Sequence, residues 1–257
     1  DTTCAAAVSG AVWCWGRNDQ GQLGDGSTQS RATPAAVPGL PEVSAVAVGT
    51  LHACALATDG TVWCWGDGGE GQLGRNSRDD SLIPVQVKNA LGLLLTGVTT
   101  LALGEYFSCA FKADGVFCWG RGDYGEQGSG KEHDQSSPQP VSADVEGTSF
   151  GPVEQLSTGY RHACVVRGEG ELWCWGHNEY GQAGDPSLLE ALLPVRVETP
   201  GPVTAVGAGG EHTCAALASG AVWCWGTNRY AQIGDGDSMY AVRYPTEVEG
   251  ARGALEI

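Results

Sequence analysis

Apolar and polar positions along this chain predict short β-strands separated by tight turns, in a pattern that recurs five times. In the second repeat, residues 54–64 read C-A-L-A-T-D-G-T-V-W-C, which are two apolar strands around a Thr-Asp-Gly turn. Alternating strands bounded by Gly, Asp and Ser predict antiparallel hairpins. A period of about 50 residues built from such strands is typical of a β-propeller or another β array.

Cysteine and tryptophan mark the same period. The 10 Cys residues form five pairs, and the second Cys of each pair lies in a W-C-W-G motif, or F-C-W-G in the third repeat. All 10 Cys and all 9 Trp belong to this pattern. A polar, glycine-rich loop follows each motif, and a Pro with a nearby Val comes next. We therefore expect one blade for each repeat.

Counting along the hairpin predicts how the cysteines pair. A three-residue loop, Thr58–Gly60, with Gly60 in the left-handed conformation, places Cys54 directly opposite Cys64. Cross-strand neighbours approach disulfide range. The alternative, a redox or metal site, usually needs C-x-x-C pairs, and the sequence has none. The third repeat is one residue shorter, so its hairpin must differ. The predicted bridges are Cys4–Cys14, Cys54–Cys64, Cys109–Cys118, Cys164–Cys174 and Cys214–Cys224.

The repeats also suggest how the propeller closes. In repeats two to five an incoming strand begins eleven residues before the first Cys, at Val43, Val98, Val153 and Val203. The first repeat lacks this strand, and residues 253–257 could supply it. We expect a single all-β domain over residues 1–257, a five-bladed β-propeller closed by the C-terminal strand pairing into the first blade. Such pairing would remove an exposed sheet edge.

Charge and cysteine content narrow the possible environments and partners. The chain has 30 acidic and 14 basic residues, a net charge of −16, which argues against nucleic acid and anionic membranes. Regularly paired cysteines indicate an oxidising compartment, so we expect a secreted, periplasmic or cell-surface protein. The longest apolar stretch, residues 90–104, is too short and too rich in Gly and Thr to span a bilayer. No cofactor is expected.

The motifs resemble the regulator of chromosome condensation repeat family, whose signature recurs five times over nearly the whole chain. The resemblance implies a propeller with blades of about 50 residues that presents one face to another protein. Within the family, the inferred compartment and the acidity are most similar to a secreted bacterial branch that inhibits β-lactamase. In the second repeat the signature is carried by Gly49, His52, Ala55, Leu56, Asp59, Gly60, Val62, Trp65, Gly66, Gly71, Gln72, Leu73 and Gly74.

The turns that carry the G-x-x-H motif are the leading candidates for a binding surface. Their frame is constant while their tip residues differ between repeats, and variable tips on a rigid frame often bind partners. The tips combine aromatic, Arg and acidic side chains, as protein interfaces do. The alternative is ordinary solvated turns. The candidate contact residues are Glu105, Tyr106, Phe107, Tyr160, Arg161 and Glu211.

Other recurring residues have both a functional and a structural interpretation. His52, His162 and His212 could suggest a metal or a base, but we favour packing within the blades. Tyr124, Tyr180 and Tyr230 could form an aromatic stripe or could pack on the next repeat. The Asp-rich loops at residues 67–70 and 235–237 could hold Ca²⁺, yet they lack EF-hand spacing, and we expect no metal site. Residues 131–134 and 89–100 could be partner-specific loops or decoration.

The sequence contains no nucleophile elbow, phosphate-binding loop or zinc-protease motif, so we do not expect an enzyme. We expect a secreted, disulfide-stabilised scaffold that binds another protein through one face, with inhibition as one form of that role. The chain should be a monomer or self-associate weakly. Two alternatives remain open: an extracellular structural or surface-array protein, and a carbohydrate-binding or hydrolytic propeller.

Overall fold

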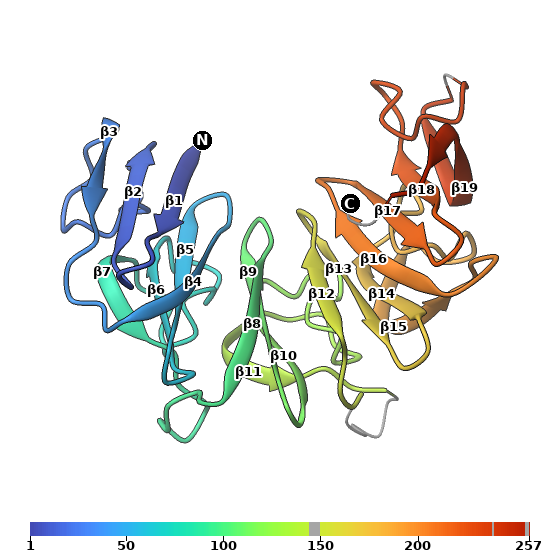
Figure 1. Ribbon diagram of the computed structural model, residues 1–257. Helices are drawn as coiled ribbons and strands as arrows, with labels where there is room; N and C mark the ends of the chain where they lie inside the picture. Colours follow the sequence, from blue (N-terminus) through green and yellow to red (C-terminus); the bar gives the residue numbers. More distant parts are fainter. Residues whose placement is uncertain (144–149, 238, 255–256) are drawn as a thin grey trace. The chain divides into compact units, whose positions relative to one another are not determined.

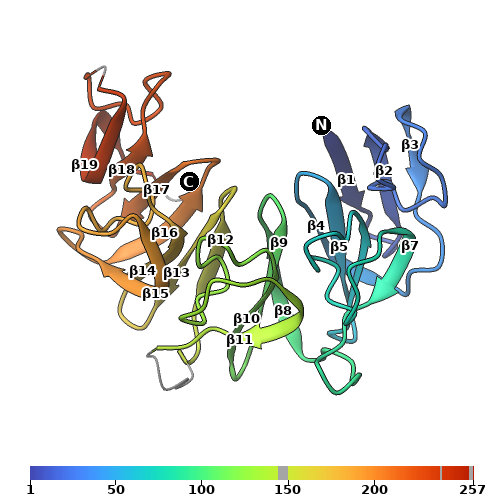
Figure 2. The same ribbon diagram turned by 180° about the vertical axis from the view of Figure 1, so that it is seen from behind.

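The protein is described by a computed structural model over residues 1–143, 150–237, 239–254 and 257. Across these residues, nineteen strands form five antiparallel sheets, one for each sequence repeat (Figure 1; Figure 2). Each sheet is one blade of the predicted type. The described residues contain no helix with the length and apolar character needed to cross a bilayer.

The strands follow chain order within every sheet. The first sheet has three strands, β1 (Thr2–Ala6), β2 (Val12–Gly16) and β3 (Arg31–Ala36). The second sheet contains β4 (Val43–Val48), β5 (His52–Ala57), β6 (Val62–Gly66) and β7 (Ser81–Gln86). The third contains β8 (Val98–Leu103), β9 (Phe107–Lys112), β10 (Gly115–Gly120) and β11 (Gln135–Pro140). The fourth contains β12 (Gln155–Thr158), β13 (His162–Arg167), β14 (Glu171–His177) and β15 (Glu190–Val197). The fifth contains β16 (Val203–Ala208), β17 (His212–Leu217), β18 (Ala221–Thr227) and β19 (Ala241–Arg252).

The sheets belong to two compact units. Unit 1 comprises residues 1–122 and 133–140 and holds the first three sheets. Unit 2 comprises residues 123–132 and 141–257 and holds the fourth and fifth sheets. The loop 123–132 therefore leaves β10 in unit 1 and packs with unit 2, while β11 returns to complete the third sheet.

All five predicted disulfides are present, each across one hairpin. In the second sheet Cys54 lies opposite Cys64, and Gly60 adopts a φ of +79°, as the bulged three-residue loop requires. The shorter third hairpin pairs Lys112 with Gly115 and still places Cys109 opposite Cys118. The one-residue difference is absorbed in the loop, so the bridge keeps its register.

The hydrophobic core of unit 1 lies between consecutive sheets. In unit 1, Val12 and Leu23 of the first repeat pack in one cluster with Val43 and Trp65 of the second. A hydrogen bond that recurs at these junctions joins the second Trp of the W-C-W-G motif to a backbone carbonyl of the preceding repeat. The bonds run from Trp65 to Gln22, Trp119 to Gln72, Trp175 to Glu126 and Trp225 to Gln182, at 2.8–3.0 Å.

Closure through the first blade stays a prediction. The first sheet has three strands in the described part of the chain, with β1 at its edge. The strand that was expected to complete it includes Leu255 and Glu256, which lie outside the described residues, and Ile257 lies against Gly207 of β16. The other incoming strands begin where expected except in the fourth sheet, where β12 starts at Gln155, two residues after Val153.

Candidate protein-binding surface

The three G-x-x-H motifs and the matching segment 104–107 of the third repeat form tight turns between the first two strands of four sheets. In each turn the glycine N–H donates to the carbonyl of the fourth residue at 2.9 Å, as from Gly159 to His162 and from Gly209 to His212. The glycine is needed because the aromatic ring of that fourth residue lies against it. A Cβ on Gly159 would come within 2.3 Å of His162 Cε1. The two tip residues are thereby held on a rigid frame.

Two of the three motif histidines, His52 and His162, are structural. His52 and His162 are buried, and each Nε2 lies 2.9 Å from a hydroxyl of the next sheet, on Ser108 and Thr213. Both hydroxyls donate onward to a backbone carbonyl, so each histidine must donate from Nε2 and carry its proton there. Burial lowers the pKa of both imidazoles to about 3, which keeps them neutral.

The six predicted contact residues are divided between the two units. Glu105 and Tyr106 are half-buried in unit 1, where the Arg121 guanidinium lies 5.9 Å from the ring centre of Tyr106. The prediction that Phe107 contacts a partner is wrong. Its side chain is 1% exposed, because it begins β9 at the position that His52 and His162 hold in their repeats.

Unit 2 brings Tyr160 and Glu211 together at a hollow of about 280 Å³. The Tyr160 N–H donates to the Gly210 carbonyl at 2.9 Å, which joins the turn of the fourth sheet to that of the fifth. The loop after β18 adds Arg229 and Tyr230 to the lining. Tyr160 is 55% exposed and Tyr230 is 88% exposed, so both rings are available to a partner. We call Tyr160, Glu211, Arg229 and Tyr230 the turn surface.

A chain of stacked aromatic and basic side chains continues from this surface. Tyr180 lies edge-on to Tyr240, with ring centres 5.7 Å apart. The Arg229 guanidinium lies 4.4 Å from the ring centre of Tyr240 and 5.8 Å from that of Tyr180. Contacts of this kind between Arg and aromatic faces are favourable. They hold Arg229 beside the hollow at little further entropic cost on binding.

The repeated tyrosines divide between the two interpretations given by the sequence. Tyr124 packs on His177, with ring centres 4.8 Å apart, and the Arg161 guanidinium lies 5.3 Å from the Tyr124 ring. Tyr180 packs on Tyr240. These two therefore pack on the following repeat. Tyr230 is largely exposed and belongs to the turn surface.

Sequence reasoning missed Arg229 and Tyr240. Arg229 directly precedes Tyr230, so the recurring tyrosine position could have pointed to it. Tyr240 lies at the end of a loop before β19, outside the repeated motifs, and is 51% exposed. Only the folded loop brings its ring to Arg229.

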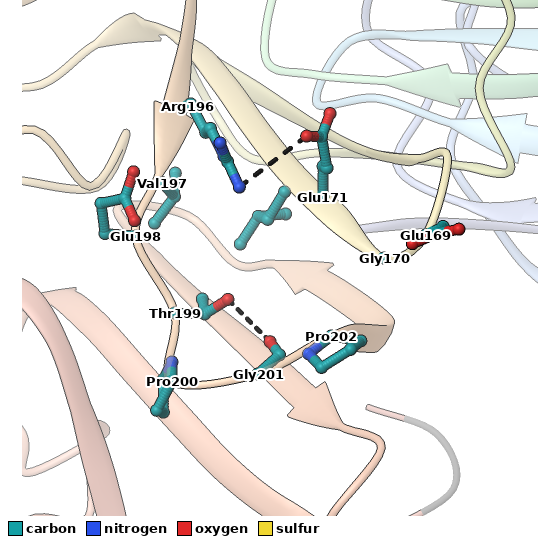
Figure 3. Close-up of a pocket in the computed structure, with 11 residues that line it drawn as sticks. Glu169, Gly170, Glu171, Arg196, Val197, Glu198, Thr199, Pro200, Gly201 and Pro202 are labelled. Atoms are coloured by element: carbon teal, nitrogen blue, oxygen red, sulfur yellow. Dashed lines mark hydrogen bonds and ion pairs between the residues drawn. The ribbon is translucent and has the colours of Figure 1, made fainter.

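A second hollow of about 280 Å³ lies elsewhere in unit 2, lined by residues 169–172 and 196–202. Figure 3 shows Arg196 reaching toward Glu171, and their charged groups are 3.7 Å apart. Glu171 also accepts a hydrogen bond from the Trp173 indole at 3.4 Å. Glu171 therefore serves as the partner of both Arg196 and Trp173 within the fourth sheet.

The described residues contain no group of three or more His, Cys, Asp or Glu side chains arranged to hold a metal ion. The Asp-rich loops use their carboxylates locally. Asp67 accepts from the Gly69 N–H at 3.0 Å and from the Gln72 amide at 3.0 Å. Asp235 accepts from the Asp237 N–H at 3.1 Å. The two bonds from backbone N–H groups are those of Asx turns.

Comparison with protein families assigns the whole sequence to one family. The model of the RCC1-like domain matches residues 1–257. The chain is 32% identical over 204 residues to the ultraviolet-B receptor UVR8 of Arabidopsis thaliana, which covers 78% of this chain and 45% of the relative. It is 41% identical over 194 residues to the probable E3 ubiquitin-protein ligase HERC4 of Rattus norvegicus, covering 71% of this chain and 18% of the relative.

Solved structures show the same fold. Yeast RCC1 (Prp20), in a crystal structure bound to Kap60, superposes with a TM-score of 0.83 at 21% identity, covering 97% of this chain and 59% of that one. Human WBSCR16 gives a TM-score of 0.81 at 24% identity, covering 96% and 64%. The predicted fold class, an all-β propeller with one disulfide in each blade, is confirmed. The chain spans less than two thirds of the length of these relatives.

Proposed function

Since this chain belongs to the RCC1-like domain family, we propose that it is a non-enzymatic scaffold that binds another protein through the turn surface. The observation that carries the proposal is the exposure of Tyr160 and Tyr230 beside Arg229 at one hollow. Tyr and Arg are enriched among the residues that dominate binding energy at interfaces. Folds of this kind host many functions, so the argument rests on the site.

We further propose that the protein works outside the cytosol. Five disulfides are compatible with an oxidising compartment, since cytosolic thiols are kept reduced. Inhibition of a secreted enzyme is one form that the binding role could take. In that case the turn surface would cover the active site of the partner, and binding would stop its reaction.

The experiment first identifies the partner and then measures it. A photo-crosslinking residue at Tyr230 captures the bound protein from the native extracellular fluid, and the captured protein is then purified. Its Kd is measured for the unchanged chain and for Tyr230→Ala and Arg229→Ala. Tyr244→Ala is the matched control, because Tyr244 is also exposed, at 63%, but lies on β19 outside the hollow.

Loss of an interface hot spot costs about 2 kcal/mol or more, so each variant should weaken binding about 30-fold. Tyr244→Ala should change Kd less than about threefold, as an exposed residue outside the interface does. Equal binding by the unchanged chain, Tyr230→Ala and Arg229→Ala would show that the partner uses another surface. The turn surface would then be ordinary solvated turns.

A further inference from the structure

We infer that unit 1 contains a second binding site, which takes a carboxylate group carried by a polypeptide with apolar neighbours. The site is a hollow of about 300 Å³ on the second sheet, lined by Trp63, Arg75, Val85, Gln86 and Lys88. It shares no residue with the turn surface and does not depend on the function proposed for that surface.

The backbone places two cations next to each other at this hollow. Trp63 of β6 lies opposite Gln86 of β7. Two residues later, the Lys88 N–H donates to the Gly74 carbonyl at 2.8 Å, which sets Lys88 beside Arg75. Like charges side by side repel each other and favour an anion between them. The chain as a whole has a net charge of −16, so two neighbouring cations in one hollow differ from its generally acidic character.

Two buried donors in the lining have no acceptor. Trp63 Nε1 and Arg75 Nε have no hydrogen-bond partner in the part of the chain that the structure describes. The contacts of Asp79 with this guanidinium are made at Nη2, which lies 3.3 Å from its carbonyl and 3.6 Å from its carboxylate, and they leave Nε without an acceptor among the described residues. Buried donors without acceptors are unfavourable. A ligand oxygen that reached Nε and Nε1 would satisfy both groups.

The fourth repeat shows which acceptor this indole takes. Trp173 holds the position of Trp63, and its Nε1 donates to the carboxylate of Glu171. Thr61 stands where the fourth repeat has Glu171, so the second repeat has no carboxylate of its own at this place. The comparison therefore identifies the missing acceptor as a carboxylate.

The charges of the surrounding positions are also reversed between the two repeats. Arg75 and Lys88 correspond to Asp185 and Glu198 in the fourth repeat. Figure 3 shows Glu198 at the rim of the fourth-sheet hollow, where the chain supplies both the cation and the carboxylates. In the second repeat the charged residues that line the hollow are both cations, and Asp79 contacts Arg75 from outside this lining.

A loop of exposed leucines borders the hollow and indicates a polypeptide rather than a free acid. Leu94 pairs with Lys88 in an isolated β-bridge, and Leu91 and Leu93 lie in the same loop. Leu91 is 83% exposed, Leu93 is 62% exposed and Leu94 is 40% exposed. An acidic side chain flanked by apolar ones would place its carboxylate on the cations and its neighbours on the leucines.

The test follows the Trp63 indole N–H by ¹H–¹⁵N NMR of the full chain, with Trp63→Phe used to assign its signal. The probes are the blocked tripeptide Leu-Asp-Leu, its amide match Leu-Asn-Leu, sodium acetate and inorganic phosphate. We expect Leu-Asp-Leu to shift the signal downfield and to bind about tenfold tighter than acetate, since each 1.4 kcal/mol of added apolar contact is a factor of ten.

Variants separate the cations from the indole. Arg75→Gln and Lys88→Gln should each weaken peptide binding about tenfold, which is the loss expected for one charge-assisted hydrogen bond. Arg78→Gln is the control for charge, because Arg78 pairs with Asp134 at 3.2 Å and does not line the hollow. Thr61→Glu keeps Trp63, Arg75 and Lys88 unchanged. The introduced carboxylate should accept the hydrogen bond of the Trp63 indole N–H and so prevent the peptide from binding.

Four results would overturn the proposal. The carboxylate assignment fails if Leu-Asn-Leu binds as well as Leu-Asp-Leu, or if phosphate binds tighter than acetate. The polypeptide assignment fails if acetate binds as tightly as Leu-Asp-Leu. The location fails if Arg75→Gln, Lys88→Gln and Thr61→Glu all leave the shift of Trp63 unchanged. Because the turn surface is intact in every variant, failure here leaves the proposed function untouched.

Discussion

The buried histidines make the stability of this protein depend on pH in a window where few other groups titrate. His52 and His162 have pKa values lowered to about 3 by burial, against 6.5 when exposed. A histidine with a depressed folded pKa stabilises the fold fully above its unfolded pKa, and this stability is lost as pH falls toward the folded pKa. Acidification should therefore destabilise the protein from about pH 6.5 downward.

The magnitude follows from the pKa difference. Between pH 7 and pH 5 the unfolded chain takes up a proton at each histidine while the folded chain does not. Each site then loses about 2 kcal/mol of unfolding free energy, at about 1.4 kcal/mol per pH unit. The folded state resists protonation because Nε2 already donates to a hydroxyl, and the second proton would sit on a buried Nδ1 that has no acceptor among the described residues.

The assay is urea unfolding at pH 7 and pH 5 with the disulfides intact, followed by tryptophan fluorescence. The double variant His52→Phe with Ser108→Ala places Phe where the third repeat has Phe107 and should remove about 2 kcal/mol of the pH dependence. Val8→Ala, at an exposed side chain that does not titrate, is the control and should leave the pH dependence unchanged. An unchanged pH dependence in the double variant would refute the assignment to His52.

Three further predictions concern stability. Gly49→Ala should lower the unfolding free energy by about 1–3 kcal/mol, because its Cβ would lie 2.5 Å from His52 Cε1, while Gly201→Ala, which has open space, should not; urea midpoints decide between them. Ala231→Gly should raise it by about 0.5–1 kcal/mol, because Ala231 has a φ of 58° at a position where other repeats have Gly; an unchanged or lower melting temperature would contradict this. Replacing Cys54 and Cys64 together by Ala should lower the unfolding free energy by about 2–3 kcal/mol. A melting temperature equal to that of the unchanged chain would count against a stabilising bridge.

The hairpins were predictable because the distance between paired cysteines fixes the register. Cys54 and Cys64 lie opposite each other for the reason given by the sequence, the left-handed Gly60 in a three-residue loop. The third repeat kept its bridge by shortening that loop. Local chemistry was sufficient here, since each bridge joins strands that are consecutive in the chain.

The binding residues were only partly predictable. Phe107 adjoins a turn tip, but its ring packs against Gly104 and is buried, and its alignment with His52 could have revealed this. The position of the Arg229 guanidinium depends on its contact with the ring of Tyr240, which lies in a separate loop. Arg75 and Lys88 become neighbours through the backbone hydrogen bond between Lys88 and Gly74, a separation of fourteen residues. The equivalent bond recurs in the third and fifth repeats, but no pair of cations flanks it there, so the repeat pattern alone does not mark this pair.

The hydrogen bond from each motif tryptophan to the preceding repeat ends on a main-chain oxygen rather than on a side chain. In the third repeat the acceptor residue is Glu126 instead of Gln, and the bond from Trp175 remains at 2.9 Å. Substitution at the acceptor position therefore leaves the linkage in place. Loops that follow the motif are free to diversify over evolutionary time, while neighbouring modules stay coupled through an atom that mutation cannot delete.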